Sequence, residues 1–287
     1  MTRDTTFEEA RPLLFGIAYR LLGSRAEAED AVQDTFLRWH AADRGAVENA
    51  RAWLTSVCTR HCIDLMRAAD RSRVDYVGAW LPEPVHAAEA TSPEDVAALD
   101  SSLSVAFLML LRRLAPKERA AYLLHDVFEL DYREIAAVLG IREPACRKLV
   151  SRARASVASG RYAQAPARER QEELLRAFQQ AVSEGATDRL KQLLAEDVEL
   201  RADGGGKVAA AEAPVLGRDA VLGFVGGALR EYWSAYRWEM TELNGTVAAM
   251  LWLGDQLAAT VSFGWDEERR ARAVYIVRNP DKLAALG

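Results

Sequence analysis

The chain has 287 residues, half of them hydrophobic, and its 37 Lys and Arg against 42 Asp and Glu leave a formal net charge of −5. This length predicts two or three domains, each able to bury a core. The negative charge excludes a protein that coats nucleic acid through bulk positive charge, so nucleic-acid binding would need local basic patches. No signal-peptide pattern and no apolar run of roughly eighteen residues is present, so we expect a cytoplasmic protein without membrane contact.

The cysteines do not have the spacing of a disulfide framework. Cys58 and Cys62 lie one helical turn apart and Cys146 lies far along the chain, which indicates reduced thiols. Cys58, His61 and Cys62 could be considered as metal ligands, but no fourth candidate lies near them in the sequence. We therefore expect neither a metal nor a cofactor.

The first seventy residues are predicted to form three helices, over 8–22, 25–39 and 49–69. The second helix has a set of residues at helical spacing that we expect to be buried: Ala28, Ala31, Val32, Thr35 and Trp39. Its remaining face is acidic. The third helix can begin at Asn49, a favourable N-cap, and its exposed side is mostly basic.

An acidic, proline-punctuated linker follows from about residue 74, with no Lys or Arg before Arg112. Within it, the run from Trp80 to Val85 (WLPEPV) is too apolar and too rigid for a simple spacer. We expect this run to dock on a protein surface.

The segment from 115 to 157 has the pattern of a helix-turn-helix. Asp131 can cap a short helix, Glu134 can complete its capping box, and Gly140 can end it. Pro144 suits the first turn of the next helix, which is predicted to run to about Ala158.

This second helix has two different faces. Its basic and hydroxyl residues cluster on one side: Arg147, Lys148, Ser151, Arg152 and Arg154. Its apolar residues fall on the other: Ala145, Cys146, Leu149, Val150, Ala153 and Val157. A helical hairpin with a solvated basic face is the plain alternative. The capped first helix, glycine turn and early arginines favour a recognition helix in the major groove of DNA.

A second break at residues 160–166 introduces a different domain. Helices are predicted over 168–185, 188–195 and 217–232, and the apolar period then changes to two. Strands are expected over 198–202, 235–243, 247–253, 257–265 and 272–277, with Asn244-Gly245 as a hairpin turn. Helices followed by a curved antiparallel sheet make an α+β domain.

The amino-terminal half resembles extracytoplasmic-function (ECF) sigma factors of bacterial RNA polymerase. Residues 28–39 (AEDAVQDTFLRW) with 51–54 (RAWL) are similar to region 2 of that family. Residues 114–119 (LAPKER), 132–136 (YREIA) and 151–154 (SRAR) are similar to its region 4. Together these blocks cover about residues 7–160.

The remaining residues resemble a polyketide-cyclase-like (SnoaL-like) domain, a cone-shaped member of the nuclear-transport-factor-like superfamily. Three segments resemble the signatures of sigma factors that carry this domain: Trp80, Leu81, Pro82, Glu83 and Pro84; Asp203, Gly204, Gly205 and Gly206; and Asn279, Pro280, Asp281, Lys282 and Leu283. The resemblance assigns these segments to interdomain regulation. It implies a multidomain chain of two all-α sigma domains followed by an α+β domain, with boundaries 1–73 (region 2), 74–103 (linker), 104–160 (region 4), 161–167 (linker) and 168–287.

The resemblance also implies partners and site residues. The exposed face of the second helix would meet the clamp helices of the polymerase largest subunit through Gln33, Asp34, Leu37 and Trp39. Promoter DNA would be bound at the −10 element by Arg60, His61, Asp64 and Arg67 with the loop over 40–49, and at the −35 element by Arg147, Lys148, Ser151 and Arg152. Arg142 and Glu143 stand where the family often has a small hydroxyl residue that caps the recognition helix.

The C-terminal domain leaves two interpretations open. It could regulate the sigma module in cis, or it could be a catalytic (isomerase- or cyclase-like) or small-molecule-sensing domain, with Asp197, Asp203 and the tryptophans 233, 238 and 252 as candidates. No acid–base pair with a defined spacing supports catalysis, and aromatic residues in strands are more often core. We therefore expect no enzymatic activity, while a small ligand stays open.

Overall fold

The computed structural model describes residues 5–72, 76–86, 100–160 and 163–287, leaving out the side chains of 70–72, 100 and 101. The chain forms two compact units. The described residues of the first, helical unit are 5–72, 100–102 and 110–160. Those of the second unit are 76–86, 103–109 and 163–287. The second unit therefore contains the WLPEP segment as well as the C-terminal domain.

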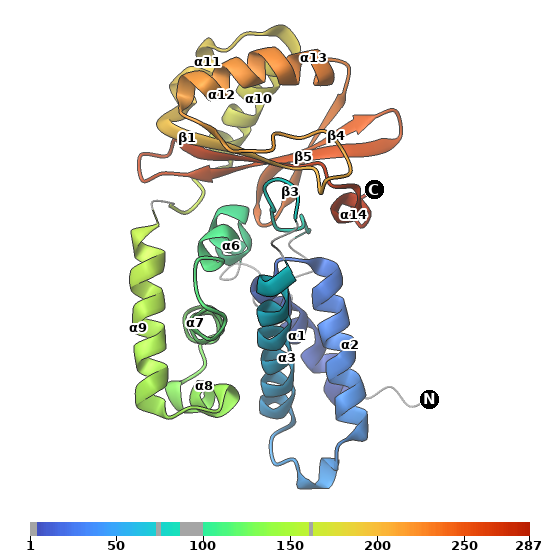
Figure 1. Ribbon diagram of the computed structural model, residues 1–287, viewed down its shortest axis with the longest axis vertical. Helices are drawn as coiled ribbons and strands as arrows, with labels where there is room; N and C mark the ends of the chain where they lie inside the picture. The colour runs from blue at the N-terminus through green and yellow to red at the C-terminus, as the bar shows by residue number, and fades with distance from the viewer. Residues whose placement is uncertain (1–4, 73–75, 87–99, 161–162) are drawn as a thin grey trace. The chain divides into compact units, whose positions relative to one another are not determined.

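Three long helices lie side by side in the helical unit (Figure 1): α1 (Thr5–Leu22), α2 (Arg25–Ala41) and α3 (Ala50–Ser72). The short helix η1 (Arg44–Ala46) lies in the loop between α2 and α3. Ser24 caps α2 and Asn49 caps α3, each through a side-chain oxygen that accepts a backbone N–H. All five residues expected to be buried in α2 are buried.

The helix-turn-helix has the local chemistry that its sequence predicts. It comprises α7 (Pro116–Tyr122), the π-helical turn η4 (Leu123–Val127), α8 (Tyr132–Leu139) and α9 (Glu143–Ser159). Asp131 and Glu134 form the capping box, with Glu134 N–H to Asp131 Oδ1 at 2.7 Å and Asp131 N–H to Glu134 Oε2 at 3.0 Å. Gly140 ends α8 with a left-handed φ of +62°.

One face of α9 packs through Cys146, Val150 and Ala153. The expectation that Ala145 is buried is wrong, since this residue is exposed. Ala145 lies in the first turn of the helix, where residue spacing alone does not define the edge of the packed stripe.

Arginines connect the three-helix part of this unit to the helix-turn-helix. Arg60 of α3 donates from Nε to the carbonyl of Val138 at 2.6 Å and from Nη2 to that of Ala137 at 2.7 Å. Arg119 of α7 donates from Nη1 to the carbonyl of Leu21 at 2.7 Å. These carbonyls lie in the last turns of α8 and α1, where backbone acceptors have no partner inside the helix and the helix dipole favours a cation.

The second unit is built on a six-stranded sheet in the order β2-β1-β6-β5-β4-β3. Its strands are β1 (Leu194–Asp203), β2 (Val215–Leu216), β3 (Arg237–Leu243), β4 (Thr246–Leu253), β5 (Gln256–Trp265) and β6 (Ala271–Val277). The sheet is antiparallel, as expected, at every strand pair but one, since β1 and β6 pair in parallel. The period of a strand reports its exposed face but not the direction of its neighbour.

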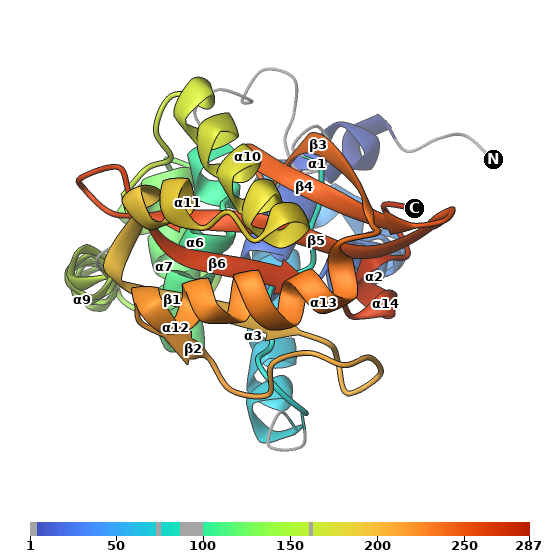
Figure 2. The same ribbon diagram turned by 90° about the horizontal axis from the view of Figure 1, so that it is seen from above.

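Both faces of this sheet are covered. One face lies under five helical segments (Figure 2): α10 (Arg168–Glu184), α11 (Asp188–Leu193), α12 (Arg218–Phe224), the π-helical η5 (Val225–Leu229) and α13 (Arg230–Trp233). Residues of the other face pack with Leu81, Val105, Ala106 and Leu283. Leu81 belongs to the WLPEP segment, and the others to α6 (Val105–Leu111) and α14 (Pro280–Leu283). Successive residues of β6 alternate between the two cores, as Val274 and Tyr275 do.

Several boundaries differ from expectation, among them those of α11 and β1. The helix predicted over 188–195 ends at Leu193, and β1 begins at Leu194 rather than at Val198. The short 3₁₀ helix η3 (Asp100–Leu103) precedes α6.

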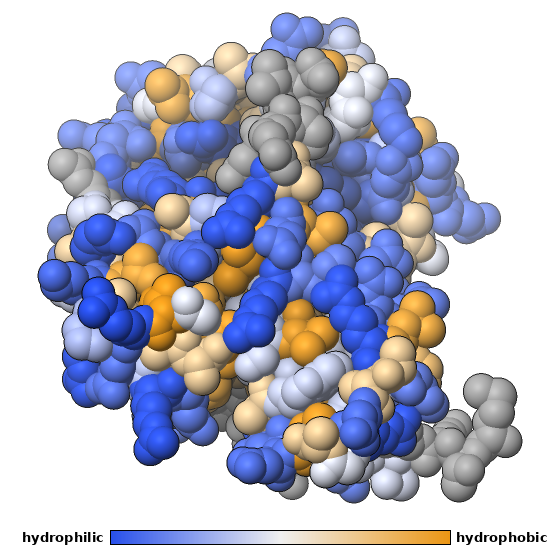
Figure 3. Space-filling view, turned by 60° about the horizontal axis from the view of Figure 1, so that its bottom comes forward, coloured by the Kyte–Doolittle hydropathy of each residue, from blue (hydrophilic) through white to orange (hydrophobic). Residues whose placement is uncertain are grey.

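On the face that Figure 3 presents, hydrophilic side chains separate the hydrophobic ones into small groups. Among the described residues, no helix is long and apolar enough to cross a bilayer.

Gly140→Ala is expected to destabilise the helical unit by about 1 kcal/mol, because an L-residue is strained at the left-handed φ that ends α8. The measurement is urea unfolding followed by circular dichroism. Gly223→Ala in α12 is the matched control: its added Cβ meets nothing within 4 Å and its φ is not left-handed, so it should stabilise by about 0.5 to 1 kcal/mol. Equal shifts in both variants would contradict the assigned helix end.

Candidate functional site

The basic face of α9 carries the four residues predicted to read the −35 element, and all four are exposed: Arg147, Lys148, Ser151 and Arg152. Both arginines of this set form ion pairs. Arg147 contacts Glu143 at 2.6 Å and lies 4.3 Å from the Tyr132 ring centroid. Arg152 contacts Glu118 at 2.8 Å. The N-cap residue Arg142 makes no side-chain capping bond, in keeping with the missing hydroxyl residue.

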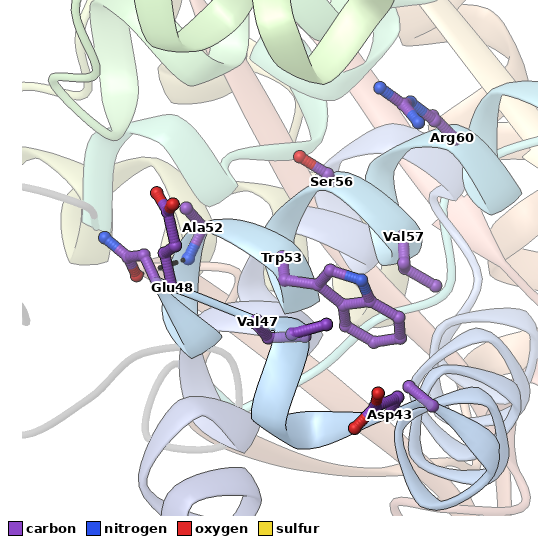
Figure 4. Close-up of a pocket in the computed structure, with 11 residues that line it drawn as sticks. Asp43, Val47, Glu48, Ala52, Trp53, Ser56, Val57 and Arg60 are labelled. Atoms are coloured by element: carbon purple, nitrogen blue, oxygen red, sulfur yellow. Dashed lines mark hydrogen bonds between the residues drawn. The ribbon is translucent and has the colours of Figure 1, made fainter.

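An open hollow of about 650 Å³ lies between the α2–α3 loop and the first turns of α3. Figure 4 shows the Trp53 indole at its centre, Val47 beside the ring, and Asp43 and Arg60 farther along the wall. Trp53 is half-buried, and its ring centroid lies 5.4 Å from that of Trp39. The hollow thus offers an aromatic face together with the polar side chains of Asn49 and Ser56.

The residues predicted for the −10 element are not equally free. Arg60 is held by the end of α8, as described above. His61 is half-buried and lies between Asp34, 3.1 Å from its Nε2, and Arg38, 3.3 Å from its Nδ1. Asp64 and Arg67 form an exposed pair at 3.3 Å. The structure therefore places these residues on one helix but engages Arg60 within the protein.

The predicted polymerase-binding set is only partly on the surface. Gln33, Asp34 and Leu37 are exposed on α2, and Leu37 is 57% exposed. Trp39 is 4% exposed, so its expected place on that surface is wrong. Its indole packs against Trp53 and lies under Arg44, whose Cζ is 5.2 Å from the ring centroid. Helical spacing had already placed Trp39 with the buried residues of α2.

In the second unit, the three signature segments converge on the buried carboxylate of Asp203. Its Oδ1 accepts hydrogen bonds from the Tyr76 hydroxyl at 2.5 Å and the Gly205 N–H at 3.0 Å. Its Oδ2 accepts from the Leu81 N–H at 2.8 Å and from Lys282 Nζ at 2.7 Å. Asp203 is 0% and Lys282 8% exposed. A buried ion pair is stable only when its remaining hydrogen-bonding capacity is filled, as it is here.

Lys282 completes the contact with the WLPEP segment. Its Nζ also donates to the Leu81 carbonyl at 2.5 Å and lies 4.2 Å from the Trp80 ring centroid. The pKa of Tyr76 is raised above its usual range, mainly by burial and to a smaller extent by the hydrogen bond to Asp203. Because the pKa of Tyr76 is raised in the folded state, its contribution to stability is complete at neutral pH. This contribution begins to fall only above pH about 10, the ordinary tyrosine pKa, and is lost as pH rises through the higher folded-state value.

The glycines and Asn244 hold the same segment. A Cβ on Gly205 would lie 2.3 Å from Asn279 Nδ2, and one on Gly206 would lie 3.2 Å from Val77 Cβ. A side chain at Gly205 or Gly206 would therefore crowd a neighbouring segment. Asn244 Oδ1 accepts a hydrogen bond from the Val85 backbone N–H at 3.3 Å, and the backbone N–H of Asn244 donates to the Val85 carbonyl at 2.8 Å.

Sequence reasoning missed Tyr76 and Asn244 as anchors of the linker. Asn244 was assigned to a hairpin turn, which it does form between β3 and β4, and nothing in that pattern shows that its amide faces another segment. Pro82, Glu83 and Pro84 are buried, whereas Pro280 and Asp281 are exposed. Asp75 and Glu89, two acidic residues of the predicted linker, lie outside the described residues.

Both carboxylates considered as catalytic candidates are engaged by other groups of the protein. Asp197 pairs with Arg272 at the surface, and Asp203 is held by four donors. A cavity of about 320 Å³ lies beside Trp233, and its lining residues include no carboxylate. The ring centroids of Trp238 and Phe178 lie 6.1 Å apart, and the Trp252 ring makes a cation–π contact with Arg237.

The cysteines are all buried and free of disulfides, as expected. A hydrogen bond with Cys58, together with burial, raises the pKa of the Cys62 thiol well above its usual value. A metal ligand would need the thiolate. No cluster of three or more potential metal ligands occurs in the described part of the chain.

A helical domain with an open aromatic hollow, followed by a helix-turn-helix with a basic outer face, defines a class of promoter-recognition proteins. Comparison with known proteins supports this assignment to a class. Residues 6–72 match Sigma-70 region 2 and residues 104–157 match Sigma-70, region 4. The chain is 38% identical over 228 residues to the ECF RNA polymerase sigma factor SigJ of Mycobacterium tuberculosis, covering 79% of this chain and 73% of that protein.

Two further comparisons extend this result. The chain is 33% identical to the probable ECF RNA polymerase sigma factor SigI of M. tuberculosis, covering 76% of this chain and 83% of that protein. The crystal structure of M. tuberculosis SigJ superposes with a TM-score of 0.76 at 33% identity, covering 98% of each chain. The chain therefore belongs to the ECF sigma factor family, which acts in transcription initiation, and carries a fused sheet-containing C-terminal domain.

Asp203→Asn should destabilise the second unit by about 3 to 5 kcal/mol, because it leaves the buried Lys282 ammonium without its counter-charge. Urea unfolding of the full chain measures this change. Lys207→Met is the control, since it removes an ion pair to Asp281 whose two side chains are 52% and 64% exposed and should cost less than about 1 kcal/mol. Equal stability of the two variants would show that the buried pair contributes no more than a surface pair.

Proposed function

We propose that α9 reads the −35 element and that the hollow beside Trp53 receives a base of the −10 element. Support for the first assignment comes from the exposed basic face of α9, opposite its packed face. Support for the second comes from the half-buried Trp53 ring, because unpaired bases stack on aromatic side chains. Arg67 and the neighbouring polar residues of α3 would contact the strand.

The exposed side of α2 is the proposed contact with the clamp helices of the polymerase largest subunit. Leu37 lies there among Gln33 and Asp34, which gives an apolar centre with a polar rim. Trp39 supports this surface from beneath, through its packing on Trp53, rather than contacting the partner.

Arg60 suggests that the compact helical unit is a resting arrangement. Its guanidinium donates to two carbonyls of α8, so the group proposed to meet DNA is occupied. Binding of the −10 element by Arg60 would exchange these two acceptors for phosphate or base oxygens. Separation of α3 from α8 is then part of promoter binding.

Arg147→Ala and Arg152→Ala should each weaken promoter binding by about 1 to 3 kcal/mol if the side chain contacts a guanine edge. The measurement is binding of the holoenzyme to promoters in which each −35 base pair is substituted in turn. Base readout predicts that the loss disappears on promoters already altered at one position. A uniform loss across all promoters would assign these arginines to phosphates instead.

For the C-terminal domain, we propose regulation in cis without catalysis. The observation that carries this proposal is the binding of the linker segment by Asp203, Lys282 and Asn244. That segment joins region 2 to region 4 in the sequence, so holding it restricts the arrangements open to the two DNA-binding domains. Deletion of residues 168–287 is a poor test, because it would remove the apolar partners of Leu81 and Val105 and leave these two side chains uncovered.

Tyr76→Phe is a gentler test, since it removes only the hydroxyl that bonds Asp203 and Asn279. In transcription with core polymerase, we expect it to broaden the tolerance for the spacing between the −35 and −10 elements, because the linker is held less firmly. Tyr232→Phe, at an exposed tyrosine of the same unit, is the control and should keep the wild-type profile. An unchanged profile for Tyr76→Phe would contradict regulation through this anchor.

A further inference from the structure

The cavity beside Trp233 has the composition of a small-molecule site. It lies between the helical layer and the strands β1 and β6, and four aromatic side chains contribute to its lining: Phe224, Tyr232, Trp233 and Tyr236. Alanines at 202, 209–211 and 228 leave the space open. Its volume is about 320 Å³. A cavity of about 150 Å³ holds one benzene molecule, so this cavity has room for two fused rings.

One charged residue, Arg278, lines this cavity. Its guanidinium donates from Nη1 to the Ala209 carbonyl, and its Cζ lies 5.8 Å from the Trp233 ring centroid. No carboxylate pairs with it among the described residues, in contrast to most arginines of this unit. A cation beside an apolar cavity without a counter-charge favours an anionic ligand.

The position of Arg278 is set by the backbone. Its N–H donates to the Asp203 carbonyl at 2.7 Å, directly after β6 ends. Arg278 Nε and Trp233 Nε1 are buried donors that have no acceptor within the described residues. Buried donors normally have partners, and a ligand acceptor that draws the guanidinium or the indole toward it would supply one.

We infer that this cavity binds a small aromatic carboxylate, with its rings among the four aromatic side chains and its carboxylate on Arg278. A neutral aromatic molecule of the same size would fill the cavity but leave the cation unpaired. The inference goes beyond the proposed function and does not depend on it, because binding is a property of the free chain. Four of the lining alanines, Ala202 and those at 209–211, also line a hollow of about 180 Å³ that includes Val77 and Gly78 of the linker.

The test is calorimetric titration of the full chain at neutral pH with 1-naphthoate and with its neutral isostere 1-naphthamide. We expect saturable binding of one naphthoate per chain and binding of the amide that is weaker by about tenfold or more, the range of a charge-assisted hydrogen bond. Arg278→Gln should remove this preference. Ala228→Phe should fill the cavity and abolish binding of both compounds.

Arg237→Gln is the matched control, since Arg237 also lies over a tryptophan, with its Cζ 5.1 Å from the Trp252 ring centroid, but does not line the cavity. It should bind naphthoate like the wild type. Circular dichroism of each variant verifies the fold. Equal affinity for the acid and the amide, retained preference in Arg278→Gln, or no saturable binding by the folded wild type at millimolar ligand would each overturn the inference.

Discussion

The second unit depends on the hydrogen-bonded carboxylate of Asp203. An ionised carboxylate removed from water is costly unless its oxygens are satisfied, and here four donors from three separate segments supply that satisfaction. The donors come from the linker, the glycine turn and α14. If any one of these segments moved away, the buried carboxylate of Asp203 would lose hydrogen bonds that stabilise its charge. One side chain therefore makes a linker, a turn and a C-terminal helix into a single folded element.

The helical unit is held by a different device, in which cations satisfy the ends of helices. Arg60 serves α8 and Arg119 serves α1, and each cation meets carbonyls that have no partner within their own helix. In the proposed −10 role of Arg60, its contacts with α8 would be exchanged for contacts with nucleic-acid oxygens. The same arginine chemistry that closes this unit is suited to binding DNA.

The helices and caps were predictable because their signals are local. Asp131, Glu134 and Gly140 act within one or two turns, and the buried stripe of α2 follows from residue spacing alone. The parallel pairing of β1 with β6 was not predictable, since strand period carries no information about a neighbour some seventy residues away. The expected burial of Ala145 was wrong because spacing defines the middle of a packed face better than its limits. The exposed place of Trp39 was implied by the family resemblance, whereas its spacing had placed it correctly among the buried residues.

Residue types and their spacing were therefore enough to predict the helical domains and the basic face of α9. The three signature segments were identified by their resemblance to those of ECF sigma factors that carry a fused domain. Only the tertiary structure decided that these segments meet at Asp203, that Tyr76 and Asn244 join them, and that Arg60 is engaged by α8. It also decided that Arg278 lines an aromatic cavity to which no carboxylate contributes among its lining residues. The physical reason is that hydrogen bonds between distant segments depend on how the chain folds back on itself, which no local pattern records.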